Sequence, residues 1–172
     1  RLLTGPKGRG PQMNHAAGRT DADCLLFHHA DSSLDRDALT ELACALDDTE
    51  CQWGGFRHRF SDSNRRLAFI SWLHNYRWRK TGVIYGDQSM FVRRAFFDSL
   101  GGFPDHELED LAFSDAALAR APSRCLDSYV VTDSRKFRQM GELRGLAHVL
   151  SIIVRYEHQR RIGNEAFFRP YR

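Results

Sequence analysis

The sequence predicts an α/β protein in which a sheet is sandwiched between helices. Short apolar runs typical of buried strands alternate along the chain with amphipathic segments typical of helices. No internal repeat or low-complexity tract interrupts this alternation. The length of 172 residues fits one domain, and a hydrophobic content of 42% is enough to fill a core. We therefore expect a single domain with an α/β/α sandwich architecture.

The N-terminal part of the chain predicts a loop, a helix, a strand and a second helix. Residues 1–20 are rich in Gly and Pro, which predicts a loop that leads into a short helix from Gln12 to Ala17. The continuous apolar run of residues 24–28 is typical of a buried strand. Residues 34–46 place their apolar side chains on one helical face, and Ser33 is the predicted N-cap.

The middle of the chain predicts a strand followed by a long helix. Residues 53–60 alternate between buried-type and basic side chains, which predicts a half-buried strand after a bend at Gly54 and Gly55. Residues 64–80 carry aromatic and apolar side chains at helical spacing, with basic residues on either side. The stripe consists of Phe69, Trp72, Leu73 and Tyr76. We expect either a solvated amphipathic helix or a surface for a sugar or lipid phosphate.

The C-terminal part predicts further alternation of strands and helices. A loop at Gly86-Asp87-Gln88 leads into a strand around Met90–Val92, followed by a short helix over residues 95–100 that Gly101 and Gly102 terminate. Residues 107–121 predict a helix whose first turn is acidic, residues 128–132 a strand, and residues 141–156 an amphipathic helix.

Composition excludes several classes of protein. Basic side chains exceed acidic ones by three and are spread along the chain, so we predict no nucleic-acid partner. The four cysteines have no CxxC spacing, which predicts reduced thiols and a cytoplasmic protein. No apolar run approaches the roughly 20 residues of a membrane-spanning helix. A peripheral position at the inner membrane through Trp72, Tyr76 and Trp78 is a further hypothesis.

Three short polar segments could carry chemistry. His29 and Asp31 follow the first predicted strand, where an Asp oxygen could hold Mg²⁺ or Mn²⁺, or could simply cap the next helix. Glu109 and Asp110 open a helix, where acidic side chains complement the helix dipole and could also accept a proton from a hydroxyl group. Asp87, in the loop at residues 86–88, could equally belong to a plain turn.

Five segments, taken in order, resemble the bacterial family 2 glycosyltransferases. They are Gly8–Asn14, Leu25–Asp31, Tyr85–Gln88, Gly101–Pro104 and Leu108–Asp110. The nearest likeness is to the subgroup described as radical-SAM/selenodomain-associated, from about residue 2 to about residue 145. The resemblance implies a GT-A fold, a divalent metal and inversion at the anomeric carbon of the transferred sugar.

The resemblance also implies roles for particular residues. Asp110 matches the catalytic base and Glu109 a helper beside it, while Asp31 matches a metal ligand, with His29 where a full Asp-x-Asp motif has its first Asp. The residues that match the donor-binding segments are Arg9, Gln12, Asn14, Asp31 and Arg135, the last following Ser134. Asp87 and Gln88 match a loop on the acceptor side.

The expected protein is one domain over residues 1–172. Residues 1–34 form its donor and metal part, residues 52–135 its acceptor and catalytic part, and residues 136–172 a C-terminal helical segment. The family's N-terminal strands for nucleobase and ribose have no counterpart, so the chain resembles the C-terminal two-thirds of the fold. The expected activity moves a sugar from a nucleotide-sugar to a hydroxyl group of a glycan, lipid or small molecule.

Two alternatives to this activity remain open. One is a non-catalytic remnant of a truncated transferase. The other is a metal-dependent hydrolase of nucleotide-sugars or phosphoesters, which would gather Asp31, Asp87 and Asp110 around one metal ion.

Overall fold

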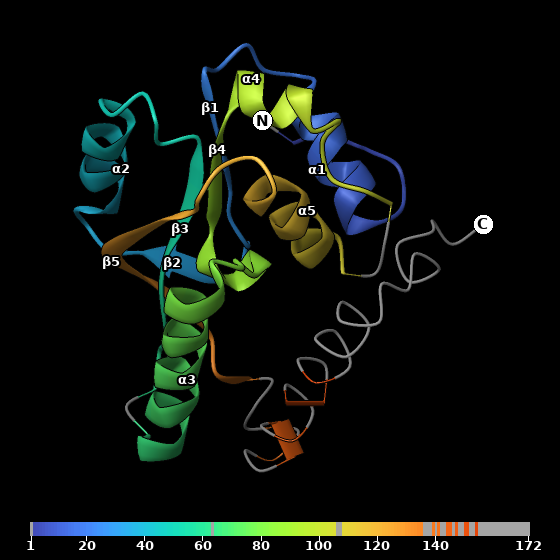
Figure 1. The fold of residues 1–172 in the computed structure, drawn as a ribbon. Helices are drawn as coiled ribbons and strands as arrows, with labels where there is room; N and C mark the ends of the chain where they lie inside the picture. Colours follow the sequence, from blue (N-terminus) through green and yellow to red (C-terminus); the bar gives the residue numbers. More distant parts are fainter. Residues whose placement is uncertain are drawn as a thin grey trace.

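The computed structural model contains a five-stranded mixed sheet with helices packed against both faces (Figure 1). It describes residues 2–62, 64–105 and 108–135, together with isolated positions between 139 and 154. The strands are β1 (Cys24–Phe27), β2 (Ser32–Leu34), β3 (Trp53–Phe60), β4 (Met90–Arg93) and β5 (Arg124–Thr132), in the spatial order β1-β4-β3-β5-β2. The predicted α/β class is confirmed.

The pairing of the strands determines which loops meet. β3 and β5 pair in parallel, whereas the β1–β4, β4–β3 and β5–β2 pairs are antiparallel. β1, β3 and β5 therefore run in the same direction, and β4 starts at the edge of the sheet where they end. The residues that follow β1 and those that precede β4 consequently lie at the same edge.

Helices cover the two faces of the sheet unequally. α2 (Ala38–Leu46) packs on one face through Ala38 and Leu42, against Phe91 and Val130. The opposite core contains side chains from α1 (Arg9–Ala17), α3 (Arg65–Thr81), α4 (Arg94–Ser99) and α5 (Glu109–Leu118). Successive side chains of β4 alternate between these cores, with Met90 and Val92 in the second and Phe91 in the first, as the pleat of a strand requires.

Gly54 and Gly55 lie inside β3, so the predicted bend before the strand is wrong. A Cβ atom on Gly54 would lie 2.2 Å from the carbonyl oxygen of Arg124 and 2.4 Å from Cζ of Phe91. Glycine is needed here because the neighbouring strand and a core ring approach the backbone closely. The irregularity in β3 occurs instead between Phe56 and Arg57, where its register against β5 shifts.

Two predicted helix starts differ from the structure by three residues or more. α1 begins at Arg9 rather than Gln12. The helix predicted from residue 34 begins only at Ala38, because Ser32–Leu34 pair with β5 as strand β2. The predicted N-cap role of Ser33 is therefore wrong, and so is a cap by Asp31, which lies in the turn before β2. A long-range strand pairing has overridden the local apolar periodicity.

α3 buries a different face from its aromatic stripe. Leu67, Ile70, His74 and Trp78 are buried, whereas Phe69, Trp72 and Tyr76 are 53%, 56% and 46% exposed. The side chain of Asn64 caps the helix by accepting a hydrogen bond from the backbone N–H of Arg66. Because Trp78 is buried, it cannot contribute to the membrane surface hypothesised with Trp72 and Tyr76.

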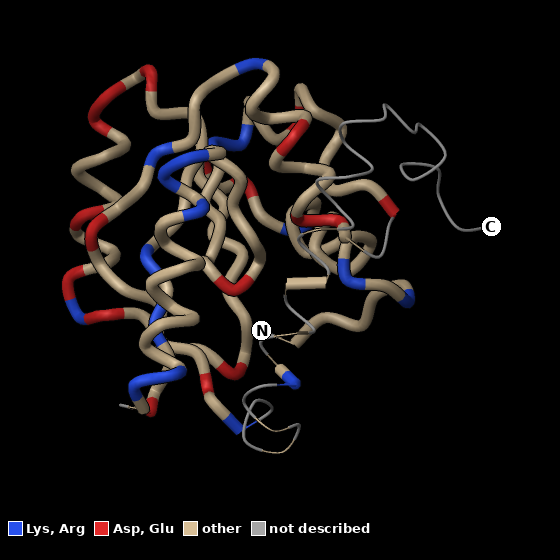
Figure 2. Tube along the Cα trace, turned by 60° about the horizontal axis from the view of Figure 1, so that its bottom comes forward, with Lys and Arg blue, Asp and Glu red and all other residues tan. Residues whose placement is uncertain are grey.

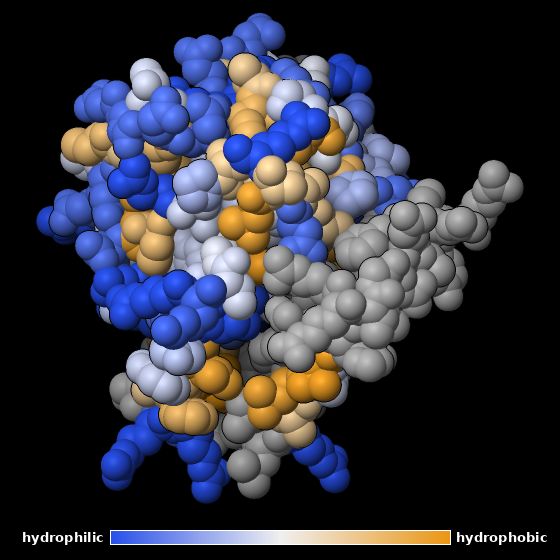
Figure 3. Space-filling model, in the orientation of Figure 1, coloured by the Kyte–Doolittle hydropathy of each residue, from blue (hydrophilic) through white to orange (hydrophobic). Residues whose placement is uncertain are grey.

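The remaining sequence predictions concern the surface, the cysteines and the C-terminus. Basic and acidic residues are interspersed around the described trace (Figure 2), and apolar areas on the face in Figure 3 are small and separated. All four cysteines are free thiols. Among the described residues no helix has the length and apolarity to cross a membrane. The helix predicted over residues 141–156 lies mostly outside the described residues.

Candidate functional site

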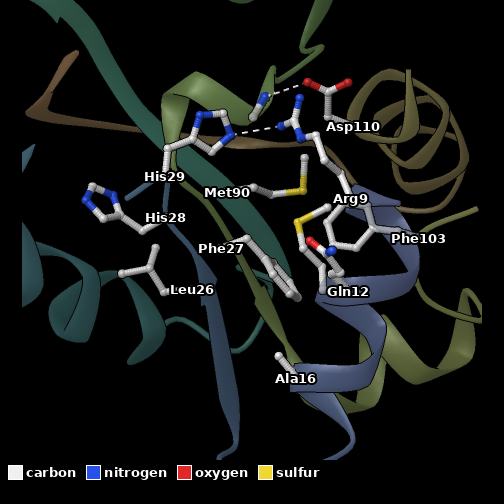
Figure 4. A pocket seen from close by; sticks show the side chains of 12 residues that line it. Arg9, Gln12, Ala16, Leu26, Phe27, His28, His29, Met90, Phe103 and Asp110 are labelled. Carbon is white, nitrogen blue, oxygen red and sulfur yellow. Dashed lines mark hydrogen bonds between the residues drawn. The ribbon is translucent and has the colours of Figure 1, made fainter. Parts of the chain in front are cut away.

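A pocket of about 360 Å³ opens where α1, the end of β1 and the start of α5 meet (Figure 4). The 3₁₀ helix η1 (Gly86–Gln88) completes its wall. Arg9, His29 and Asp110 lie together at one end of the pocket, whereas Ala16 and Leu26 lie away from them (Figure 4). The lining residues are Arg9, Gln12, Met13, Ala16, Leu26, Phe27, His28, His29, Gly86, Met90, Phe103 and Asp110.

The fold explains why these segments meet. His28 and His29 follow β1, and η1 precedes β4, so the antiparallel β1–β4 pair places both at the same edge of the sheet. His28 reinforces the corner: its Nε2 donates to the carbonyl oxygen of Ser32 at 2.9 Å, and its Nδ1 lies 2.7 Å from Oγ of Ser89. These contacts tie the residues that follow β1 to Ser89, just before β4, at the edge of the sheet.

Arg9 is the central cation of the pocket. Its Nε lies 3.0 Å from Oε1 of Glu109, and its Nη2 lies 2.9 Å from Nε2 of His29. The side chain of Arg9 is 55% exposed, while that of Glu109 is only 1% exposed. Glu109 therefore anchors the guanidinium from the protein side, and the exposed remainder can meet an anion, for which a guanidinium fork is well suited.

The protonation of the neighbours of Arg9 follows from burial. Burial and the charge of Arg9 lower the pKa of His29, which favours a neutral imidazole at neutral pH. A neutral His29 can accept a hydrogen bond from Arg9 at Nε2, and it then carries its proton on Nδ1. Burial and the adjacent Asp110 carboxylate raise the pKa of Glu109, and Arg9 opposes this rise.

Asp110 is held by two backbone N–H groups. Its Oδ2 accepts from the N–H of Gly86 at 2.7 Å, and its Oδ1 accepts from the N–H of Leu111 at 2.9 Å. Gly86 makes this convergence possible, since a Cβ atom there would lie 2.8 Å from Nη2 of Arg9 and 3.0 Å from Nε2 of His29. A carboxylate fixed in this way at the pocket wall can accept a proton from a bound hydroxyl group.

Asn14 lies outside the pocket lining. Its Nδ2 donates to the carbonyl oxygen of Phe103 at 2.7 Å, and its Oδ1 accepts from the N–H of Phe103 at 2.8 Å. The neighbouring Gly102 has a φ of 76°, a conformation that glycine adopts without strain. Asn14 thus fastens the loop that carries Phe103 into the pocket, whereas Gln12, from the same helix, lines the pocket itself.

Asp31 and Arg135 also lie outside the pocket lining. Asp31 is exposed in the turn after β1, close enough to His29 for its charge to counteract the fall in the pKa of His29. Nε of Arg135 lies 2.6 Å from Oδ2 of Asp133, and its side chain is 70% exposed. Ser134, predicted beside it, is buried.

Neither of the two residues predicted on the acceptor side lines the pocket. Gln88 is fully buried: its Oε1 accepts from the N–H of Tyr85, and its Nε2 donates to the carbonyl oxygen of Phe56. Oδ2 of Asp87 lies 3.8 Å from Nε2 of His74 and 4.0 Å from Nε2 of His58. Asp87, whose side chain is 31% exposed, therefore joins the buried His58 and His74 in a His58–His74–Asp87 cluster, which sequence reasoning did not predict.

Burial controls the charges of this cluster. It lowers the pKa of His74 to about 4 and also lowers the pKa of His58. Burial alone raises the pKa of Asp87, but the two histidines and Arg77 together hold it below its usual value. We expect neutral imidazoles beside an ionised carboxylate at neutral pH. The one sequence signal for this cluster was a histidine, His58, on the apolar face of β3.

The structure thus brings together Arg9, Gln12, His29, Glu109 and Asp110, and it separates Asn14, Asp31, Asp87, Gln88 and Arg135 from the pocket lining. Within the described part of the chain, no group of three or more His, Cys, Asp or Glu side chains is arranged to hold a metal ion. Fold and site define an α/β protein with a pocket that joins a cation, a neutral imidazole and a carboxylate. Comparison with protein-family models and with curated proteins finds no match.

Proposed function

We propose that this chain is the catalytic part of an inverting, metal-dependent glycosyltransferase of family 2, with a GT-A type of α/β fold. The reaction moves a sugar from a nucleotide-sugar to a hydroxyl group of an acceptor. One observation carries the proposal: all five segments that resemble the family contribute to one pocket or directly support it. Arg9, His29, Gly86, Phe103 and Asp110 come from these segments and line the same pocket.

The donor end of the pocket has the chemistry that a diphosphate requires. The guanidinium of Arg9 pairs with the buried carboxylate of Glu109, which fixes its position. A cation fixed in this way stabilises the negative charge that develops on a departing nucleoside diphosphate. Gln12 adds an amide on the same helix, which can donate to phosphate or sugar oxygens. His29, neutral and paired with Arg9, restrains the guanidinium without competing for its charge.

Asp110 is the proposed catalytic base. It takes the proton from the acceptor hydroxyl group as that oxygen attacks the anomeric carbon of the sugar, and the bond to the nucleoside diphosphate breaks on the opposite side. Two backbone N–H groups fix the orientation of its carboxylate before the acceptor arrives. Glu109 acts as a positioning residue, because it holds Arg9 and does not line the pocket.

The metal is assigned to Asp31. Mg²⁺ is commonly held by one or two carboxylates together with substrate phosphates and water, and an exposed carboxylate in the turn next to His29 fits such a site. A bound Mg²⁺ or Mn²⁺ would supply a Lewis acid for the donor diphosphate. His29 is a weaker ligand in this arrangement, since its Nε2 is occupied by Arg9.

The proposal is tested by donor binding and turnover measured separately. Thermal-shift titrations with Mn²⁺ and a panel of nucleoside diphosphates identify the donor class, since a ligand that binds only the folded state raises its stability. Asp110→Asn is expected to abolish turnover and to leave donor affinity within about threefold, because donor contacts remain. Asp31→Ala is expected to weaken Mn²⁺-dependent binding at least tenfold.

Asp37→Ala is the matched control for Asp31→Ala, because Asp37 is a similarly exposed carboxylate that precedes α2 and lies outside the pocket. It should leave both donor affinity and turnover unchanged. Equal donor affinity and equal turnover in the Asp110 and Asp31 variants would contradict the assigned roles. A folded chain that binds no nucleotide in the panel would favour the non-catalytic alternative.

A further inference from the structure

A second hollow, lined in part by His58 of the His58–His74–Asp87 cluster, has no role in the proposed reaction. It has a volume of about 450 Å³ and lies between α3 and the C-terminal ends of β3 and β5. We call it the α3 groove. The residues of the groove that matter below are Arg57, His58, Ser71, Trp72, Tyr76, Arg79 and Tyr129.

One wall of the groove is an exposed stack of aromatic rings. The rings of Trp72 and Tyr76 stack with centroids 5.4 Å apart and planes 17° apart. Trp72 also stacks on Phe69, which lies outside the groove. Trp72 and Tyr76 are about half exposed, because α3 packs against the protein through another face. Because Trp72 is stacked between Phe69 and Tyr76, the stack exposes ring edges and not free ring faces. These edges carry an indole N–H and a phenol hydroxyl group beside apolar carbon, which suits the mixed C–H and hydroxyl surface of a sugar.

The groove also favours negative charge. Its lining contains three arginines and one acidic residue, Asp62. Arg57 pairs with Asp127 and Arg59 pairs with Asp35, so much of their charge is compensated. Arg79 forms no ion pair with any described residue and is exposed at the rim. A guanidinium in this position offers forked hydrogen bonds to a phosphate or carboxylate group.

The floor of the groove holds buried polar atoms without partners. Oγ of Ser71, Nε of Arg57 and both ring nitrogens of His58 make no hydrogen bond to any described residue. His58 is 1% exposed and Ser71 is 7% exposed. Asn75 holds the backbone of His58 in place through two hydrogen bonds of 2.9 Å. Because buried polar groups are normally hydrogen-bonded, unsatisfied atoms on residues that line a hollow favour a polar ligand there.

We propose that the α3 groove binds a monosaccharide unit that carries an anionic group, either phosphate or carboxylate. The sugar ring lies against the exposed edges of Trp72 and Tyr76, its hydroxyl groups are directed at Ser71 and His58, and its anionic group meets Arg79. Burial lowers the pKa of His58, so its imidazole is neutral and can donate or accept a hydrogen bond at neutral pH. The proposal stands on the residues of the groove and does not depend on the transferase assignment.

Binding can be followed through tryptophan fluorescence. The chain has three tryptophans, of which Trp53 and Trp78 are buried and Trp72 is exposed in the groove. Titrations use glucose 1-phosphate, glucuronate, glucose and inorganic phosphate, with calorimetry as a second readout. Each titration is carried out on the natural chain and on the Gly86→Ala variant. The added methyl group obstructs the pocket around Arg9, so binding that persists in the variant is assigned to the groove.

Two groove variants and two controls locate the ligand. Trp72→Ala and Arg79→Gln remove groups of the groove, while Leu39→Ala and Arg65→Gln remove an exposed apolar and an exposed basic side chain outside it. We measure the variants by calorimetry, since Trp72→Ala removes the fluorophore. Both groove variants are expected to weaken the two anionic sugars at least tenfold, and both control variants less than twofold. Because all four side chains are exposed, each variant should retain the melting temperature of the natural chain within a few degrees.

Other outcomes would overturn the proposal. Equal weakening by groove and control variants would exclude the groove, as would the absence of saturable binding of both anionic sugars. If inorganic phosphate bound as tightly as glucose 1-phosphate, the groove would be an anion site without a sugar site. Co-sedimentation with phosphatidylglycerol vesicles that depended on Trp72 and Arg79, without binding of the soluble sugars, would point to a membrane surface instead.

Discussion

Arg9 and Glu109 form an ion pair with 3.0 Å between Nε and Oε1, although one side chain is half exposed and the other is almost fully buried. The pair joins the start of α1 to the start of α5 at the wall of the pocket. A buried carboxylate needs a charged partner, whereas a half-exposed guanidinium can also bind a second anion from the solvent side. The same pair therefore stabilises the fold and prepares a cation for a ligand.

Arg9→Gln is expected to lower the free energy of unfolding by about 1–2 kcal/mol at pH 7. This is less than the cost of breaking a fully buried pair, because solvent screens the exposed side of Arg9. The variant should also raise the pKa of Glu109 further, because Arg9 opposes that rise. The loss of stability caused by the variant should be smaller near pH 5 than at pH 7, because a protonated Glu109 no longer pairs with Arg9. Urea unfolding at the two pH values measures both effects.

The double variant Arg9→Gln with Glu109→Gln tests whether the two side chains act together. We expect it to be less destabilised than the sum of the single variants, with a coupling of about 1 kcal/mol. Strict additivity would mean that the contact between the two side chains contributes nothing to stability.

Gly86→Ala is expected to weaken binding of the nucleoside diphosphate at least tenfold, with little loss of stability. Its Cβ atom would lie 2.8 Å from Nη2 of Arg9, and the guanidinium is the flexible end of a side chain that can move aside. Gly18→Ala is the matched control, because its nearest contacts would be 3.6 Å or more away. Calorimetric titration with Mn²⁺ present compares the two variants. Unchanged affinity in Gly86→Ala would show that the ligand does not use the junction of Arg9 and His29.

Asn14→Ala and Gln12→Ala should have opposite effects, although both change polar side chains of α1. Asn14→Ala removes two hydrogen bonds to the backbone of Phe103 and is expected to cost about 2 kcal/mol of stability. Gln12→Ala should leave stability within about 0.5 kcal/mol and weaken nucleotide binding. Thermal unfolding and calorimetric titration measure the two properties. A fully stable Asn14→Ala that loses nucleotide affinity would favour the donor-binding role predicted from the sequence.

The protein is expected to lose stability as the pH falls from about 6.5 towards 4. Burial lowers the pKa of His74 from its ordinary value of 6.5 to about 4, so within this window the unfolded chain binds a proton that the folded chain does not. The lowered pKa of His58 acts in the same direction, as does that of Asp87 at lower pH. The raised pKa of Glu109 acts in the opposite direction.

His74→Gln isolates this contribution. It is expected to reduce the loss of stability between pH 7 and pH 5 by about 2 kcal/mol, because glutamine takes up no proton in either state. Urea unfolding at a series of pH values gives the slopes for the natural chain and the variant. Identical slopes would mean that His74 is protonated equally in the folded and unfolded chains.

The sequence by itself determined the elements whose patterns arise within a few neighbouring residues. The alternation of residues 56–60, the stop at Gly101 and Gly102 and the acidic first turn of α5 were all predictable from local spacing, whereas residues 53–56 are all buried. It also determined that Arg9, His29 and Asp110 are polar residues at the ends of elements, where side chains can reach a pocket.

Only the tertiary structure decided which of these residues meet. The β1–β4 pairing brought His29 beside Gly86, and the pairing of β2 with β5 replaced the first turn of a predicted helix. Packing of α3 against β3 buried His74 and left Trp72 exposed, although helical spacing favoured the aromatic face. Local propensity acts over a few residues, whereas strand pairing and burial join segments that are distant in the sequence, so the pocket and the groove exist only in the folded chain.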